Sequence, residues 1–163
     1  MEDPQVLAEK WRALCDDPQA PDYFELNQFG AIVLSPRSTT GHQSFAFTVA
    51  TGMQLQLGPQ ALTEVGVLTD QGVRVPDVIR MTPERWERAK RAKRATPLPF
   101  VPDTCVEVLS PGNTVSEIEM KKHAYLRGGP REVIIVGIDG SVTYFGPDGP
   151  HERSEFGLSL DLG

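Results

Sequence analysis

Two carboxylates interrupt apolar runs of the chain. Glu107 stands inside the segment 104–109, Thr-Cys-Val-Glu-Val-Leu, and Asp77 follows a proline inside the run 73–79. The apolar run around Glu107 predicts a strand that is covered on both faces of a sheet, and 73–79 is expected as a further strand. An ionised carboxylate in such a strand is costly unless a cation or hydrogen-bond donors meet it. We therefore expect a positively charged partner near Glu107.

The partner expected for both carboxylates is a shared divalent cation. If the two strands pair, Asp77 and Glu107 can face one cleft, and hard oxygen ligands of this kind suit Mg²⁺ or Mn²⁺. The backbone carbonyl of Val108 would complete the protein's ligands. Lys121, on the helix predicted to follow the Glu107 strand, would orient a water or offset developing charge. This pattern indicates phosphodiester hydrolysis.

The elements that must position these residues follow from caps, turns and periodicity. The sequence predicts an α/β fold, in which helices pack against a mixed sheet, in one domain with a core over about residues 20–163. The expected helices span 3–15, 40–57, 82 to before Pro97, and 114–127. The expected strands span 23–26, 31–34, 63–68, 73–79, 104–109, 133–138, 142–145 and 156–162.

Charge and composition limit the classes of function. The 163 residues carry a net charge of -6, which argues against a protein that coats nucleic acid non-specifically. The two cysteines have no partners at metal-binding spacing, so we expect them reduced. The first residues lack the features of a secretory signal, and no apolar run reaches membrane length, so we expect a cytoplasmic protein.

One segment is locally basic. Between Arg80 and Arg94, seven basic residues stand against two glutamates, a local charge of +5. The simplest interpretation is a solvated amphipathic helix, and the alternative is a phosphate-contacting arm beside the acids that uses Arg88 and Arg91, together with Lys122 of a later helix. Salt dependence of DNA binding separates the two interpretations.

The order of short motifs resembles a known family. The motifs that carry the likeness are Pro76-Asp77, Val106-Glu-Val-Leu-Ser-Pro111, Lys121-Lys-His-Ala-Tyr125 and Gly129-Pro-Arg-Glu-Val-Ile-Ile-Val136, with Tyr23-Phe-Glu-Leu26, His42 at a helix start and Gly157-Leu-Ser-Leu-Asp-Leu162 in the expected places. Together they are similar to the Uma-type family of putative restriction endonucleases, part of the PD-(D/E)xK nuclease superfamily. The resemblance spans nearly the whole chain.

The resemblance implies a restriction-endonuclease-like core and a Mg²⁺-dependent endonuclease acting on DNA. Asp77 and Glu107 would be the metal-binding acids. The superfamily's usual lysine, two residues after the acid, is absent because that position is Leu109. In this family the following helix supplies the lysine, which selects Lys121, with Lys122 in reserve because helical periodicity alone does not choose between them.

Each residue also has a purely structural interpretation. Glu107 could pair with an arginine from a neighbouring helix, Asp77 could be a strand-entry residue, and Lys121 could be solvated. His42 at a helix start is expected to cap or pack rather than to bind a ligand. The alternative hypothesis for the whole chain is a catalytically inactive module that keeps the nuclease fold and acts as a homodimer.

Overall fold

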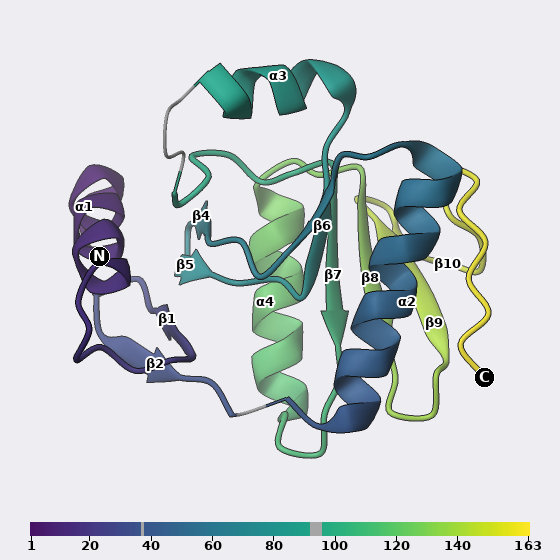
Figure 1. Cartoon of the computed structure of the whole chain (residues 1–163), viewed down its shortest axis with the longest axis horizontal. Coiled ribbons are helices and arrows are strands. Elements are labelled where there is room, and N and C mark those ends of the chain that lie inside the picture. The colour runs from purple at the N-terminus through teal and green to yellow at the C-terminus, as the bar shows by residue number, and fades with distance from the viewer. Residues whose placement is uncertain (37, 92–95) are drawn as a thin grey trace.

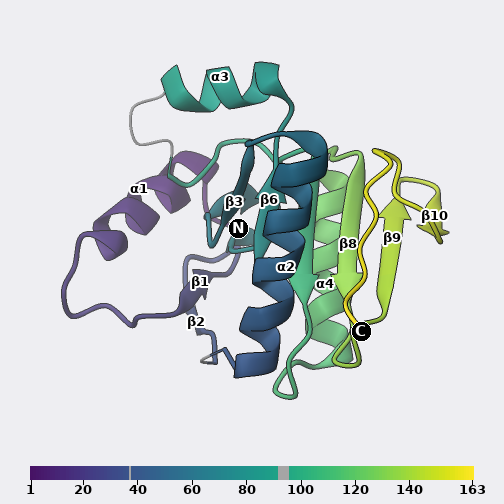
Figure 2. The same cartoon turned by 45° about the vertical axis from the view of Figure 1, so that its right-hand side comes forward.

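The computed structural model describes residues 1–36, 38–91 and 96–163. A mixed sheet of six strands has one long helix on each face (Figures 1 and 2). Its strands lie in the order β10 (Gly149–His151), β9 (Val142–Gly146), β8 (Glu132–Val136), β7 (Thr104–Val108), β6 (Val78–Arg80) and β3 (Ala61–Thr63). Only β7 and β8 are parallel among these pairs. The predicted α/β class, a mixed sheet flanked by helices, is confirmed.

The two faces of this sheet are covered by different helices. Helix α2 (Thr40–Leu57) packs Val49 and Met53 against Val106 and Ile134 of the sheet. Helix α4 (Val115–Arg127) packs Tyr125 against the opposite face, where Ile79 and the other side chains of that core are buried. Because alternate residues of a strand point to opposite faces, Val106 contacts the α2 side and Glu107 faces the α4 side. Glu107 thus lies between the central strand and α4.

A smaller sheet lies beside the large one. Its strands have the order β2 (Ile32–Leu34), β1 (Phe24–Leu26), β5 (Gly72–Arg74) and β4 (Val67–Thr69), and all of its pairs are antiparallel. Helix α1 (Pro4–Cys15) covers it through Leu7 and Trp11. Helix α3 (Pro83–Arg91) lies at one end of the large sheet (Figure 1).

The helices follow local capping signals. The Asp3 carboxylate accepts a hydrogen bond from the N–H of Gln5, and a proline occupies the first turn of α1. Thr39 and Thr114 cap α2 and α4 in the same way. The basic cluster forms α3 as far as Arg91, and its remaining part, 92–95, lies outside the described residues. None of the described helices is long and apolar enough to cross a membrane.

Two predicted strands were wrong in the same way. The run 63–68 is divided between β3 of the large sheet and β4 of the small one, and the run 73–79 between β5 and β6. The first break contains Glu64, whose φ of 54° leaves the strand region. The second contains Pro76, which has no N–H to donate to a ladder. Asp77 therefore lies in a crossover between two sheets, directly before β6, and not inside a strand.

The predicted last strand over 156–162 was also wrong. This segment forms no strand, because the side-chain amide of Gln56 on α2 takes the place of a neighbouring strand: it accepts from the N–H of Ser159 at 2.8 Å and donates to the Ser159 carbonyl at 2.8 Å. Conversely, the short strand β10, which pairs with β9, was not among the predicted strands.

Candidate active site

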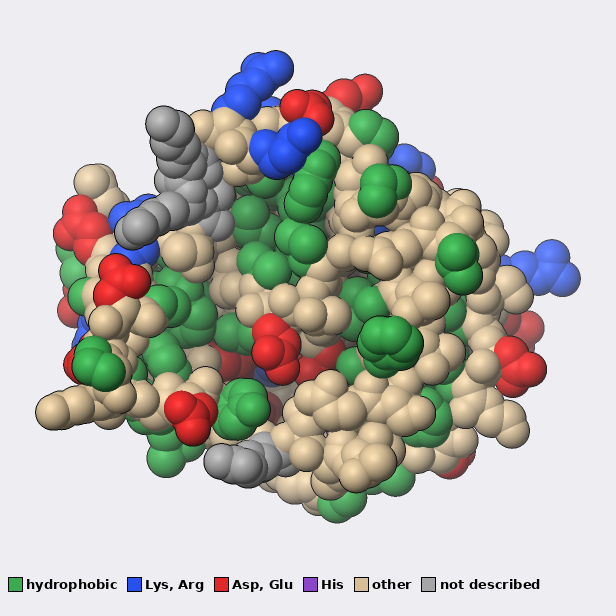
Figure 3. All heavy atoms as spheres, viewed as in Figure 1, with side chains coloured by type: hydrophobic (Ala, Val, Ile, Leu, Met, Phe, Trp, Pro, Cys, Tyr) green, Lys and Arg blue, Asp and Glu red, His purple; other side chains and the backbone are tan. Residues whose placement is uncertain are grey.

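A cleft of about 480 Å³ lies between the α1–β2 part of the chain and the large sheet. Residues from the segment 11–24, together with Ser35, Pro36 and Ser38, contribute one side. The crossover at Asp77, strand β7 and helix α4 contribute the other, with Glu25 of β1 also in the lining. Figure 3 shows the hollow between these two parts, with acidic side chains at its floor. The cleft thus lies where the two sheets meet.

Asp77 is held at this junction by both of its oxygens. Its N–H donates to the Val106 carbonyl at 2.9 Å, which continues the pairing of β6 with β7. Its Oδ2 accepts from the N–H of Val108 at 2.7 Å, and its Oδ1 lies 3.1 Å from Nε2 of His42. The predicted pairing of the Asp77 and Glu107 segments is therefore present, and both carboxylates line the same cleft.

Glu107 is a buried carboxylate with only 4% of its surface exposed. Its Oε1 accepts from the Tyr125 hydroxyl at 2.7 Å and lies 2.8 Å from Nζ of Lys121. Burial raises the pKa of Glu107 to about 8, with help from the charges of Asp77 and Glu25, although Lys121 opposes the shift. One lysine and one hydroxyl do not compensate fully for the burial of this carboxylate.

Lys121 reaches the acids and Lys122 does not. Nζ of Lys121 lies 2.8 Å from Glu107 and 3.0 Å from Glu25. Burial alone would lower the pKa of Lys121, but these two carboxylates outweigh that effect and raise it. Lys122 instead pairs with Glu119 at 2.8 Å and lies over the ring of Phe145. The geometry favours Lys121, the residue selected by the family resemblance.

Sequence reasoning missed Glu25 as a member of this cluster. Besides contacting Lys121, Glu25 accepts the N–H of Val75 at 2.6 Å and lies 3.5 Å from Arg74. The local sequence offered little signal, because a glutamate between two apolar residues of a hairpin strand usually faces solvent. Only the packing of the small sheet against α4 buries it.

His42 was expected to cap or pack, and it lies in the first turn of α2, where its N–H donates to the side chain of the cap residue Thr39. Its imidazole also faces Asp77, and this hydrogen bond raises the pKa of His42, although burial opposes the change. Its Nδ1 is buried without a hydrogen-bond partner in the described part of the chain. His42 is thus a second residue of the site whose role its local sequence did not indicate.

The donor set fits a hard divalent cation. In the described ranges, Oε2 of Glu107 makes no hydrogen bond or ion pair, and Asp77 borders the same cleft. No group of three or more His, Cys, Asp or Glu side chains in those ranges is arranged to hold a metal. Mg²⁺ is commonly bound by one or two carboxylates, with water at its other coordination positions. The Val108 carbonyl remains a predicted third ligand.

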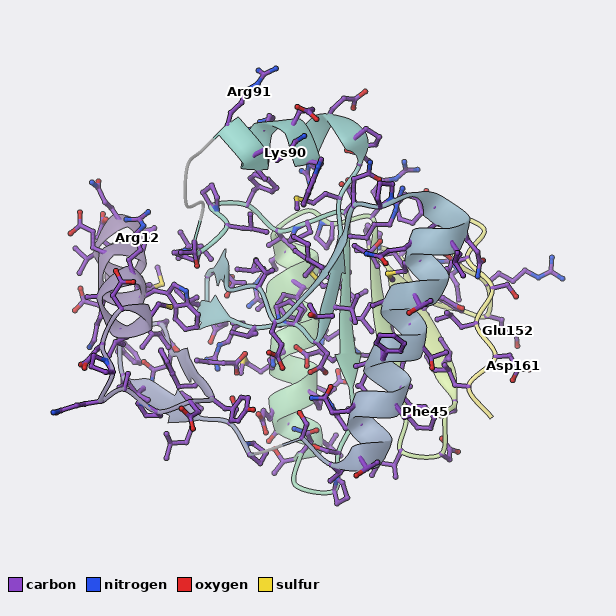
Figure 4. The ribbon with its side chains drawn as sticks, in the orientation of Figure 1. Arg12, Phe45, Lys90, Arg91, Glu152 and Asp161 are labelled. Carbon is purple, nitrogen blue, oxygen red and sulfur yellow. The ribbon has the colours of Figure 1, made fainter. Side chains whose placement is uncertain are left out.

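The basic residues predicted to contact nucleic acid lie apart from the acids. Of the described residues that line the cleft, none belongs to α3. The Arg88 guanidinium lies 5.5 Å from the centre of the Phe100 ring, and Arg91 projects from α3 into solvent (Figure 4). Their contact with a substrate remains a prediction.

Comparisons with known proteins identify the family and the fold. The model of the Uma2 family, described as "Putative restriction endonuclease", matches residues 8–161. A crystal structure described as a putative nuclease belonging to DUF820, from Anabaena variabilis, is similar, with a TM-score of 0.73 over 93% of this chain and 94% of that chain. At 17% identity that likeness shows the fold alone. No curated protein matches the chain. The chain belongs to the Uma2 family of putative restriction endonucleases.

Proposed function

We propose that this protein is a metal-dependent endonuclease that hydrolyses phosphodiester bonds in DNA. The observation that carries the proposal is the meeting of Asp77, Glu107 and Lys121 in one cleft, from three segments that are separate in the sequence. Family membership supports nuclease activity, and the choice of metal, substrate and catalytic residues is our inference.

Each residue has a distinct part in this proposal. Asp77 and Glu107 would hold the cation, with the Val108 carbonyl as a further ligand. A bound Mg²⁺ or Mn²⁺ would supply Lewis-acid stabilisation and a water of lowered pKa. The Lys121 ammonium keeps a positive charge beside the carboxylates, where it can orient the attacking water and offset charge that develops on the phosphate.

The neighbouring side chains preorganise these groups. The Tyr125 hydroxyl and Lys121 both hold Oε1 of Glu107, which leaves Oε2 for the cation. His42 and the N–H of Val108 fix the two oxygens of Asp77. Such positioning matters because catalytic groups act efficiently only when their geometry is set before the reaction.

The alternative is an inactive module that keeps the nuclease fold and acts as a homodimer. The paired state of Lys121 favours this alternative, because its ammonium is already engaged by two buried carboxylates. The position of the lysine also favours the inactive module. The superfamily's usual lysine position is occupied here by Leu109, and the candidate lysine lies on a helix instead. A homodimer would be detected by light scattering of the full chain.

A thermal-shift titration separates the two hypotheses. A nuclease with this site should be stabilised by Mn²⁺ or Mg²⁺, and Glu107→Gln should abolish that shift. Asp77→Asn should reduce it as well. A module without a metal site should show the same melting temperature with and without either cation, and its Glu107→Gln variant should respond as the wild type does.

A further inference from the structure

The two sides of the cleft differ in chemistry. The side formed by residues 11–24 is largely apolar, with Leu14, Pro18, Pro21, Tyr23 and Phe24 among its lining residues. Trp11 also lines the cleft, and its ring packs against that of Phe24 with 4.9 Å between ring centroids, so the two rings support each other on this side. Tyr23 remains 43% exposed while lining the cleft. It therefore offers an aromatic ring to whatever enters.

Charge keeps phosphate away from this apolar side. Asp17 and Asp22 are exposed and line it, and they would repel a phosphodiester backbone. Among the described lining residues, Lys121 and His42 are the only basic ones, and both face carboxylates at the floor. A carboxylate can instead accept hydrogen bonds from the exocyclic amines of nucleobases. The wall thus suits a neutral, flat, amine-bearing group.

These features point to a base and not to a duplex backbone. A duplex keeps its bases stacked and paired, so a base can reach a wall inside a cleft only when it is unpaired. Sites for single-stranded nucleic acid combine aromatic stacking platforms with positive charge along the path of the backbone. Here Lys121 at the floor, together with the cation of the proposed site, would supply the positive charge, and Tyr23 would supply the stacking platform.

We propose that the side of the cleft around Tyr23 receives an unpaired nucleobase, so that the substrate is single-stranded DNA. This inference rests on the proposed function, since it names the substrate class of the same site. Tyr23 would stack on the base next to the scissile phosphate, and Asp22 would accept from its amino group.

Binding tests this inference without requiring cleavage. Fluorescence anisotropy would measure the affinity of the full-length protein in Ca²⁺ for a labelled single strand, for the same strand in a duplex, and for an abasic version of it. We expect Tyr23→Ala to weaken binding of the single strand about tenfold and Tyr23→Phe to change it less than about twofold. Phe29→Ala is the matched control, because Phe29 is 63% exposed and does not line the cleft.

The inference is overturned if the duplex binds as tightly as the single strand, if Tyr23→Ala binds like the wild type, or if nothing binds. Cleavage by the wild type in Mn²⁺ is scored separately. Binding that depends on Tyr23 without any cleavage would refute the nuclease proposal, and only the binding of an unpaired base at Tyr23 would then stand. Cleavage of duplex DNA but not of single-stranded DNA would support the nuclease proposal and refute this inference.

Discussion

Replacing Glu107 by Gln should change how the stability of the metal-free protein depends on pH. The pKa of Glu107 rises from 4.5 to about 8 on folding, mainly because the side chain is buried. The folded state therefore holds a proton that the unfolded state has released between these two values. The free energy of unfolding must therefore fall as pH rises from about 4.5 to 8. Above pH 8 the contribution of Glu107 no longer changes with pH.

The size of the effect follows from the same shift. Each unit of pKa difference corresponds to about 1.4 kcal/mol, so Glu107 can cost at most about 5 kcal/mol above pH 8. Glutamine can keep the hydrogen bond from Tyr125 but leaves Lys121 paired with Glu25 alone. We therefore expect Glu107→Gln to be more stable than the wild type at pH 8.5 by about 2 to 4 kcal/mol, and about equally stable near pH 4.5.

Urea denaturation in the presence of a chelator, at pH values from about 4.5 to 8.5, would measure this difference. Glu9→Gln is the matched control, because Glu9 is exposed on α1, and it should follow the wild type throughout. If the wild type and Glu107→Gln lose stability in parallel as pH rises, the carboxylate is not held at a raised pKa and the reasoning from its burial fails.

Three further predictions test the surroundings of the site. Lys121→Met should destabilise the fold by about 3 to 5 kcal/mol because it removes the ammonium group that lies between two buried carboxylates, whereas Lys122→Met should cost about 1 kcal/mol. Urea denaturation measures both, and equal costs would contradict the assignment. Tyr125→Phe removes the hydroxyl that donates to Glu107 and should lower the free energy of unfolding by about 1 to 3 kcal/mol in the same assay. An unchanged free energy of unfolding would contradict this hydrogen bond. Gly66→Ala would place a methyl group 2.8 Å from the Trp11 ring and should cost about 1 to 3 kcal/mol, seen as a lower melting temperature; an unchanged value would contradict this packing.

The sequence predicted the elements that have strong local signals. The helices begin where Asp3, Thr39 and Thr114 cap them, and the central strand coincides with an apolar run that is buried throughout. The caps and this run lie within short stretches of chain, which is why a single sequence suffices for them. The pairing of the segments that hold Asp77 and Glu107 joins distant stretches, and the sequence supported it only as a condition.

The divided strands could not be predicted in this way. The apolar residues of 73–79 fit one buried strand, because both β5 and β6 are buried although they belong to different sheets. The division arises only because the small sheet exists and the chain must cross to it. The same crossover places Asp77 where both of its oxygens can be held, so this error concerned the feature that positions the site.

The remaining site residues depend on packing between distant segments. Glu25 resembles an ordinary strand residue until the small sheet buries it against α4, and His42 resembles a helix-start residue until the crossover approaches it. The choice between Lys121 and Lys122 was open for a related reason. Both lie near the buried stripe of α4, and only the positions of Glu25 and Glu107 distinguish them.

The central claim is that Asp77 and Glu107 together make this cleft a metal-dependent nuclease site. Cleavage of mixed single-stranded and duplex DNA should be measured in Mn²⁺, in Mg²⁺ and in a chelator for the wild type, Asp77→Ala, Glu107→Gln and the Glu9→Gln control. We predict cleavage by the wild type and the control only when the metal is present, and none by either site variant. Cleavage that persists in the chelator, or that survives Glu107→Gln, would contradict the claim.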